Sequence, residues 1–310
     1  MALKDILVVL DASERSSACL AIASSLALRH GAGLIGLCPH RLLGAPEPAP
    51  EPPHVYPAPL GLQGIADIAT ASAIPEPASQ STLYSAPELA ERIGSAFRES
   101  LAAHSLRGTF ETEIGPPAAA IVRHARTADL VVLGQPDPDD PLAPLARRTI
   151  EDVLLTSGRP ALLVPYAGHF ATVGTNVVIG WTETREAARA AHDALPLIAT
   201  GAKTTLLAVH RGPLTPPGTE LPTSAAARHF ARHGIDARPA ETIAESLGAP
   251  SYIVRPQLNT ADALLNYASD TAADLLVVGA YAHSRAREVV LGGVTHALLA
   301  TMTLPVLMSH

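Results

Sequence analysis

Short apolar runs and longer amphipathic stretches alternate along the chain. Apolar residues in runs of strand length predict β-strands at 6–10, 34–38, 109–114, 129–134, 161–165, 177–180, 203–210, 237–242, 274–279 and 306–308. Apolar residues at helical spacing predict helices at 14–30, 88–107, 117–126, 145–157, 183–195, 223–233, 259–271 and 294–301. Asn259 is expected to cap the seventh of these helices. Because strands and helices take turns, the pattern predicts an α/β fold with parallel strands and right-handed crossovers.

The second part of the chain repeats the first. ADLVVLG begins at Ala128 and ADLLVVG begins at Ala273, 145 residues later. Two further pairs of segments match in the same way: DILVVLDAS from Asp5 with NVVIGWTET from Asn176, and RPALLVPY from Arg159 with LPVLMSH from Leu304. A repeat of this length indicates a tandem duplication. We therefore expect two domains, at 1–168 and 175–310, each of ordinary domain size.

A proline-rich stretch interrupts the first repeat. Residues 39–87 contain eleven prolines, and PEPAPEPPHVYPAP at 46–59 is typical of an extended polyproline-like segment. So long an insertion is either functional or a plain surface loop. It could be a peptide ligand for an aromatic groove, but this composition specifies little, and the surface-loop interpretation is favoured.

Composition narrows the class of protein. With 47% hydrophobic but only 4% aromatic residues, the cores must be built from aliphatic side chains. The net charge of −7 offers no basic excess for nucleic acid, and no apolar run approaches the length of a membrane span. Cys19 and Cys38 have no metal-binding spacing and are expected to be core residues in a reducing compartment. A cytoplasmic protein without nucleic-acid or membrane partners is the expectation.

The last repeat unit carries the clearest candidate chemistry. A predicted strand at 274–279 is followed by a polar loop with His283 and Arg285, and then by Gly292 and Gly293 before a predicted helix. Glycines at a helix N-terminus expose backbone N–H groups beside the positive end of the helix dipole. This arrangement favours an anion such as phosphate.

With this strand–helix order, the repeat and the glycine loop, the chain resembles a tandem universal stress protein. The resemblance covers both repeats but not the proline-rich stretch. It implies two open α/β sandwiches, each a mostly parallel five-stranded sheet flanked by helices, Rossmann-like and similar to the adenine nucleotide alpha hydrolase fold. It also implies that the fifth strands, Ala161–Pro165 and Val306–Met308, pair antiparallel, so that the domains form an intrachain pseudo-dimer. A homodimer of whole chains is left open.

Family members that bind ATP have the motif Gly, two residues, Gly, nine residues, Gly, then Ser or Thr. The second repeat matches this motif in part: Ala282 stands at the second glycine and Gly293 at the hydroxyl residue. The resemblance therefore implies ATP as the candidate cofactor. The candidate nucleotide-binding residues are Gly279, Ala282, His283, Arg285, Gly292, Gly293, Val294 and Thr295.

The first repeat holds a complementary fragment of such a site. Asp11 matches the aspartate that the family places near adenosine at the end of the first strand, whereas the second repeat has Trp181 near that position. After Gly134, however, the loop reads QPDPDDPLAP, whose aspartates would repel phosphate. We interpret Asp11 and Gly134 as a degenerate site. Neither repeat contains the complete motif.

Each of these residues also has a plainer interpretation. The Gly292–Gly293 pair suits close helix–sheet packing, Asp11 suits a helix cap, and Arg285 suits a solvated loop. His229 and His233 are spaced to share a metal on one helix face, but no third ligand is evident, so we interpret them as a surface pair and expect no metal.

The chain shows no recognisable set of nucleophile, base and orienting residue, so it is expected not to be an enzyme. The leading hypothesis is a non-enzymatic stress-response protein. Two alternatives remain: a scaffold that has lost ATP binding and uses its proline-rich stretch for a partner, and an ATP-binding signalling module with slow hydrolysis.

Overall fold

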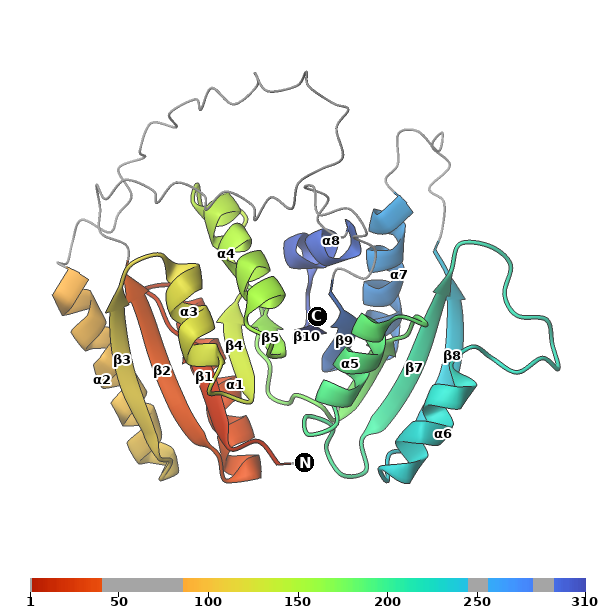
Figure 1. The fold of residues 1–310 in the computed structure, drawn as a ribbon, viewed down its shortest axis with the longest axis horizontal. Coiled ribbons are helices and arrows are strands. Elements are labelled where there is room, and N and C mark those ends of the chain that lie inside the picture. Colours follow the sequence, from red (N-terminus) through yellow and green to blue (C-terminus); the bar gives the residue numbers. More distant parts are fainter. Residues whose placement is uncertain (1, 41–85, 245–255, 281–292) are drawn as a thin grey trace, which may run out of the picture.

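Ten strands of the described residues form one continuous sheet with helices on both faces (Figure 1). The computed structural model describes residues 2–40, 86–244, 256–280 and 293–310. The strands are β1 (Asp5–Val9), β2 (Gly33–His40), β3 (Gly108–Ile114), β4 (Leu130–Gly134), β5 (Ala161–Val164), β6 (Asn176–Gly180), β7 (Lys203–His210), β8 (Ala237–Ile243), β9 (Leu275–Gly279) and β10 (Val306–Ser309). The helices are α1 (Arg15–His30), α2 (Ala86–His104), α3 (Pro117–Ala125), α4 (Ala143–Thr156), α5 (Arg185–Asp193), α6 (Ser224–Arg232), α7 (Pro256–Asp270) and α8 (Gly293–Thr301).

The sheet has the order β3-β2-β1-β4-β5-β10-β9-β6-β7-β8. Every neighbouring pair within a half is parallel, and each half repeats the same order of its five strands. The predicted α/β class and the two five-stranded parallel units are therefore confirmed. Among the helices in the described ranges, none combines the length and apolar composition that a membrane span requires.

The two halves join through their last strands. β5 and β10 pair antiparallel, with Leu162 opposite Leu307 at the centre of the register. All four residues of each strand are buried. The antiparallel pairing expected from the sequence is therefore present, and it leaves neither strand as an exposed edge that could pair with another chain.

Two hydrophobic cores cover the two faces of the sheet, and each extends through both halves. Helices α1, α2, α5 and α6 pack on one face, and α3, α4, α7 and α8 pack on the other. Alternate strand residues serve opposite cores: Ile6 and Val8 point to the first, whereas Leu7 points to the second. Few of these core residues are aromatic, as the composition requires, and small alanines on the helices allow close packing on the sheet.

The aspartate that opens each repeated ADL segment has a structural role. The carboxylate of Asp274 accepts hydrogen bonds from the backbone N–H groups of Gly174, Thr175 and Asn176 at 2.9–3.0 Å, and from the Thr175 hydroxyl at 2.6 Å. In the first half, Asp129 accepts from the backbone N–H groups just before and at the start of β1. Each aspartate thus fixes the start of the first strand of its own half.

Three of the expected boundaries that were wrong lie at a proline or near one. Pro39 lies in β2, although the sequence placed it in the insertion. A proline fits there because β1 pairs with β2 only as far as Leu37, so no β1 residue is left to accept a hydrogen bond from an N–H at position 39. Helix α2 begins at Ala86, so Pro87 lies in its first turn, where proline is tolerated. Helix α7 begins at Pro256, so Asn259 lies inside the helix and is not its cap. Residues 41–85 of the proline-rich stretch lie outside the described residues.

Candidate functional site

The candidate site of the second half lies where strands β6 and β9 end. These strands are neighbours, and the next strand along the chain, β7, pairs with the other side of β6, so a switch in strand order occurs here. Open α/β sheets bind their ligands at such switch points, beyond the carboxyl ends of the strands. Of the predicted residues, Gly279 ends β9, while Gly293 starts α8. Ala282, His283, Arg285 and Gly292 lie outside the described residues.

Gly279 is a glycine for a packing reason. Helix α5 lies against β9, and a Cβ atom on Gly279 would stand 2.5 Å from the backbone nitrogen of Ala187 and 2.6 Å from the carbonyl carbon of Glu186. Real Cβ atoms do not approach backbone so closely, so a side chain here would have to displace the helix. Gly279 therefore cannot by itself be counted as evidence for a phosphate site.

Glu186, whose backbone lies over Gly279, has a buried side chain. The Glu186 side chain is 5% exposed and accepts a hydrogen bond from Arg185 Nε. Burial raises the pKa of Glu186, but hydrogen bonds from Arg185 and the backbone, with the charges of Arg185 and His310, hold that pKa below its ordinary value. An ionised carboxylate at the start of α5 adds negative charge to this part of the second half, which disfavours an anion nearby.

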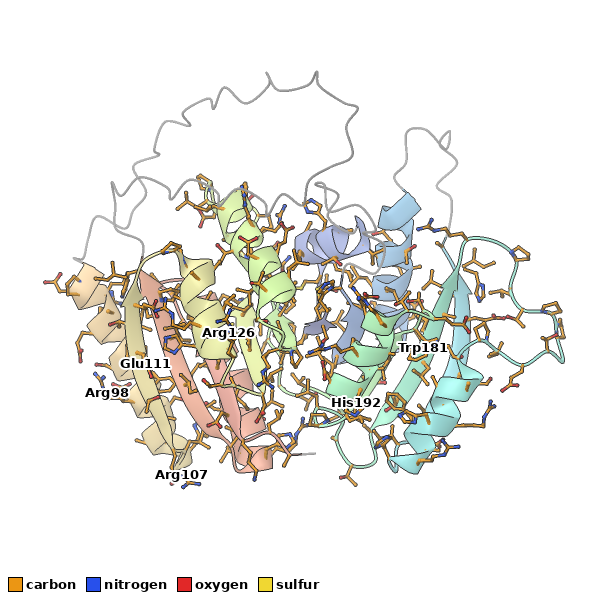
Figure 2. All side chains as sticks on the ribbon, in the orientation of Figure 1. Arg98, Arg107, Glu111, Arg126, Trp181 and His192 are labelled. Carbon is orange, nitrogen blue, oxygen red and sulfur yellow. The ribbon has the colours of Figure 1, made fainter. Side chains whose placement is uncertain are left out.

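When the start of β1 is aligned with the start of β6, Thr182 stands opposite Asp11. Trp181 directly follows β6 and stands opposite Leu10. Its backbone N–H donates to the carbonyl of Leu207 at 2.8 Å, and its ring is partly buried against the core (Figure 2). In the following turn the hydroxyls of Thr182 and Thr184 lie 3.2 Å apart, and Thr184 accepts from Ala187 N–H to cap α5. Between them lies Glu183, which is exposed. This turn therefore presents an aromatic ring, two hydroxyls and one carboxylate.

The motif residues at 293–295, which the structure describes, form the start of α8. Val294 packs partly buried against the core, and Thr295 is 3% exposed. Beside it, the β9 chain end is tied down, since Ala280 N–H donates to the Ser309 carbonyl at 2.8 Å and His310 Nδ1 lies 3.1 Å from the Ala280 carbonyl. Thr295 therefore faces the interior, while Gly293 and Val294 before it are half-buried.

In the first half, Asp11 organises a turn. Its carboxylate accepts hydrogen bonds from the backbone N–H of Ser13 at 2.9 Å, from the Ser13 hydroxyl and from the Ser16 hydroxyl at 2.8 Å. The Asp11 backbone N–H in turn donates to Ser16 Oγ at 2.7 Å. The residue that flanks α1, Glu14, makes no side-chain capping bond. Asp11 thus shapes the connection from β1 to α1, which accounts for it without a ligand.

Gly134, the other predicted residue of the first half, is covered by Arg15. A Cβ atom on Gly134 would stand 2.8 Å from Arg15 Cγ. The Arg15 guanidinium continues to the linker between the halves, where it donates to the carbonyls of Tyr166 and Gly168. In the loop that follows, Asp137 and Asp140 accept backbone N–H groups of their own turn. The Arg15 side chain therefore occupies the space over Gly134.

Gln135, which sequence reasoning treated only as part of an acidic loop, is a buried link between the halves. Its side chain is 3% exposed, and its amide nitrogen donates to the Leu299 carbonyl of α8 at 2.9 Å. Its amide oxygen accepts from Tyr166 N–H at 3.0 Å. No local sequence pattern shows this contact, because its partners are 31 and 164 residues away.

Both cysteines are buried, as the sequence predicts. Burial, with a smaller contribution from the Asp11 carboxylate, raises the pKa of Cys19 to about 12 and that of Cys38 to about 11. These thiols therefore stay protonated near neutral pH and lack the thiolate that nucleophilic or metal chemistry requires.

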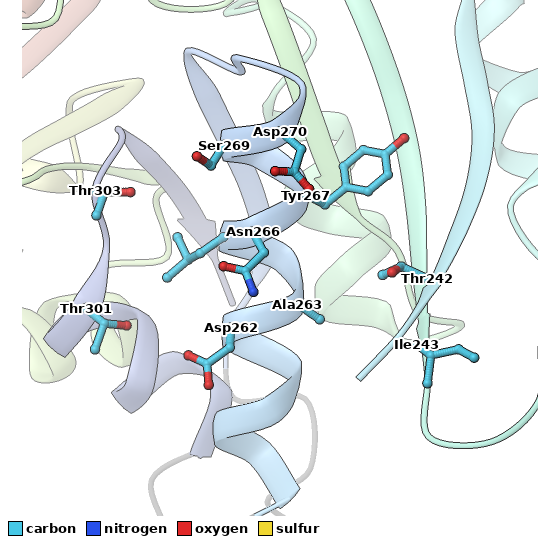
Figure 3. Close-up of a pocket in the computed structure, with 11 residues that line it drawn as sticks. Thr242, Ile243, Asp262, Ala263, Asn266, Tyr267, Ser269, Asp270, Thr301 and Thr303 are labelled. Carbon is cyan, nitrogen blue, oxygen red and sulfur yellow. The ribbon is translucent and has the colours of Figure 1, made fainter. Parts of the chain in front are cut away.

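A pocket of about 640 Å³ lies elsewhere in the second half (Figure 3). It is lined by residues of β8, α7 and the segment around the end of α8, including Asp262, Asn266, Tyr267 and Asp270. Two carboxylates in this lining make it a poor place for phosphate. Neither Gly279 nor Gly293 lines it.

Parallel strands with helices on both faces and a switch point in each half define a doubly wound α/β protein. The chain belongs to the universal stress protein family, whose sequence model matches residues 2–165 and 175–310. The tandem form expected from the repeat is thus confirmed.

Solved structures agree in fold over nearly the whole chain. A universal stress protein from Archaeoglobus fulgidus DSM 4304 is 15% identical, with a TM-score of 0.65 over 98% of this chain and 95% of that one. A functionally unknown protein from Pseudomonas aeruginosa PAO1 is 14% identical, with a TM-score of 0.57 over 99% and 92% of the two chains. No curated protein matches the chain in sequence. At these identities the likeness establishes the fold alone.

Proposed function

We propose that the chain is a non-enzymatic, cytoplasmic stress-response protein whose halves act as a built-in dimer, and that its second half accepts an adenine nucleotide, ATP. Membership of the universal stress protein family supports the stress-response role. The antiparallel β5–β10 pair, which makes one sheet of the two halves, is the observation that carries the dimer-like arrangement. The degenerate first half then serves as a structural partner for the second.

The assignment of the ligand to the second half follows from what fills the two candidate positions. In the first half, Arg15 covers Gly134, and Gln135 is committed to the junction with α8. In the second half, α8 begins at Gly293, whose N-terminal turn can offer backbone N–H groups to an anion. The sequence between β9 and α8 contains Arg285 and Arg287, whose positive charges favour an anionic ligand.

Calorimetric titration of the full chain with ATP, with and without Mg²⁺, tests this assignment. We expect one site per chain, and we expect Gly292→Asp to abolish it by placing a carboxylate before α8. The matched control is Leu142→Asp, because Leu142 is the exposed residue directly before α4 in the first half. No heat at millimolar ATP, or equal loss in both variants, would refute nucleotide binding in the second half.

A second candidate function is a scaffold that binds no nucleotide. The close approach of Gly279 to the α5 backbone favours it, since this motif glycine is explained by packing. In that case the proline-rich stretch is the element that recruits a partner. Deletion of residues 44–80 should then leave the melting temperature unchanged while a binding partner is lost in affinity capture; retention of every partner would count against the scaffold.

A further inference from the structure

Three exposed histidines from different parts of the second half meet at one corner of the molecule. His229 lies in α6, His233 directly follows α6, and His192 lies in the last turn of α5 (Figure 2 labels His192). The ring centroids of His229 and His233 are 4.8 Å apart, and those of His192 and His233 are 6.4 Å apart. Both ring pairs meet edge to face, at 72° and 89°.

The fold brings a third histidine beside the two that the sequence places on one helix face. His229 and His233 are four residues apart, so they share one side of the helix and can reach a common ion. His192 is distant in the chain, but α5 and α6 pack on the same face of the sheet, and the end of α5 comes beside the end of α6. The interpretation of His229 and His233 as an isolated surface pair is therefore incomplete.

We propose that His192, His229 and His233 form a surface site for a divalent transition metal, with zinc as the reference ion. Imidazole nitrogen is a preferred ligand of zinc, nickel and copper, and three protein ligands with water in the fourth position is a common zinc arrangement. The proposal is independent of nucleotide binding, because the histidines lie at the opposite end of α5 from Thr184 and Glu186.

The ring separations fit such a site after a small rotation of one side chain. With zinc–nitrogen distances of about 2.0–2.1 Å, two imidazoles on a tetrahedral ion have centroids roughly 5 Å apart. The His229–His233 pair already meets this separation. Among the described residues no three such side chains stand where they could hold one ion, so the site forms only if His192 moves toward the helix pair, by more than about 1 Å relative to His233. Rotation between staggered rotamers of an exposed side chain can provide that movement.

The surrounding charges set the strength of the site. Arg189 and Asp193 lie near His192 on α5, 3.7 Å apart as an ion pair. On α6, Arg228 pairs with Glu220, whereas Arg232 directly precedes His233. The three arginines outnumber the two carboxylates, so the surrounding charge does not favour a cation, and we expect micromolar rather than tighter binding. Zinc binds neutral imidazole, so competition from protons should weaken binding in acid.

The site belongs to the second half alone. The start of β1 aligns with the start of β6, and the same offset places Ala21 opposite His192. Helix α2, the counterpart of α6, has one histidine, His104, at its end. His104 is exposed and is therefore a suitable control for nonspecific binding by a surface imidazole.

Calorimetric titration of the untagged full chain with Zn²⁺ at pH 7.5, without nucleotide, tests the proposal. We expect one zinc per chain, weakened at least about tenfold in each of His192→Ala, His229→Ala and His233→Ala, and unchanged in His104→Ala. Binding should fall at pH 5.5, and Co²⁺ should give the intense visible bands of a four-coordinate ion. Circular dichroism melts check that each variant folds.

Three results would overturn the proposal. The first is absence of saturable Zn²⁺ binding up to millimolar concentration. The second is unchanged affinity in His192→Ala, which would reduce the site to the helix pair. The third is an equal loss in His104→Ala, which would show scattered binding to surface histidines. Each result leaves the ATP titration unaffected, so failure here is distinguishable from failure of the proposed function.

Discussion

The two halves share one fold but differ in what covers the glycine at the end of the fourth strand. In the first half, the flexible side chain of Arg15 lies over Gly134. In the second half, the backbone of Glu186 and Ala187 lies over Gly279. The same residue type at the same place thus has two different neighbours. The comparison teaches that a motif glycine must be judged by what a side chain there would meet.

The covering residues also differ in charge and in use. Arg15 reaches the carbonyls of the linker, and Arg29 donates to the carbonyls of Val173 at 3.1 Å and Leu197 at 2.7 Å. Gln135 also links the first half to α8 of the second half. In the other direction, Arg189 of the second half donates to the Gly158 carbonyl of the first. Glu186, by contrast, bonds only its neighbour Arg185 among the side chains described.

The largest expected effect comes from breaking the junction that makes the halves comparable. Val306→Asp would place a carboxylate on a fully buried strand opposite Leu163, where it has no partner. Such burial typically costs more than about 4 kcal/mol, so we expect loss of cooperative folding or a steep fall in melting temperature. Leu155→Asp, at an exposed apolar residue of α4, is the control. An unchanged melting temperature for Val306→Asp would contradict the joined sheet.

The second effect compares the two glycines directly. Gly279→Ala would force a Cβ into backbone and should lower the free energy of unfolding by about 2–3 kcal/mol. Gly134→Ala meets only the Arg15 side chain, which can move, and should cost less than about 1 kcal/mol. Urea denaturation of both variants measures the difference. Equal costs would mean that the α5 backbone yields as readily as a side chain.

The third effect compares the two aspartates that fix the first strand of each half. Asp274 accepts hydrogen bonds from three consecutive backbone N–H groups and one hydroxyl, whereas Asp129 accepts from two N–H groups. We expect Asp274→Asn to cost about 2 kcal/mol and Asp129→Asn about 1 kcal/mol in urea denaturation. The opposite ranking would show that the number of hydrogen bonds does not decide how much each aspartate stabilises its strand.

The cost of Asp274→Asn should also depend on pH. Burial raises the pKa of Asp274, but hydrogen bonds from Thr175, Asn176 and Thr172 outweigh burial and lower the pKa below its ordinary value. A lowered folded-state pKa stabilises the protein above the unfolded value, about 3.9, and this contribution disappears as pH falls through the folded value. The difference between wild type and variant should therefore be full at pH 7 and shrink below about pH 4. A difference independent of pH would argue against ionised Asp274 as the acceptor.

The smallest effect concerns the helices that follow the first strand of each half. Thr184 caps α5 through Ala187 N–H, whereas Glu14, before α1, makes no capping bond. We expect Thr184→Ala to cost about 1 kcal/mol and Glu14→Ala a few tenths at most, again by urea denaturation. Equal values would contradict the assigned role of the Thr184 cap, because Glu14 has no capping bond to lose.

The sequence predicts the elements well because their signals are local. Apolar runs and helical spacing depend on neighbouring residues, and the repeated ADL segments align the two halves in order. The errors at Pro39 and Asn259 arose where a local rule was applied without knowing the neighbouring strand's length or the helix's true start. Proline is excluded from a strand only where its missing N–H would be needed.

The candidate site was less predictable, because its contacts join distant segments. Nothing near Gly279 in the sequence shows that Glu186 will lie beside it, and nothing near Gln135 indicates Leu299. The motif match gives residue types at a spacing, whereas the neighbours that decide charge and room come from other strands and helices. His192 beside His233 is a further contact of this kind.

The linker between the halves has a consequence for how each half can change. A short tether holds β10 near β5 at an effective concentration of the order of millimolar, so dilution should not separate them. In a dimer of identical chains, every substitution enters both partners at once. In this chain a substitution enters one side only. Arg15 can therefore cover Gly134 in the first half, while its counterpart Glu186 can be substituted in the second half without altering that cover.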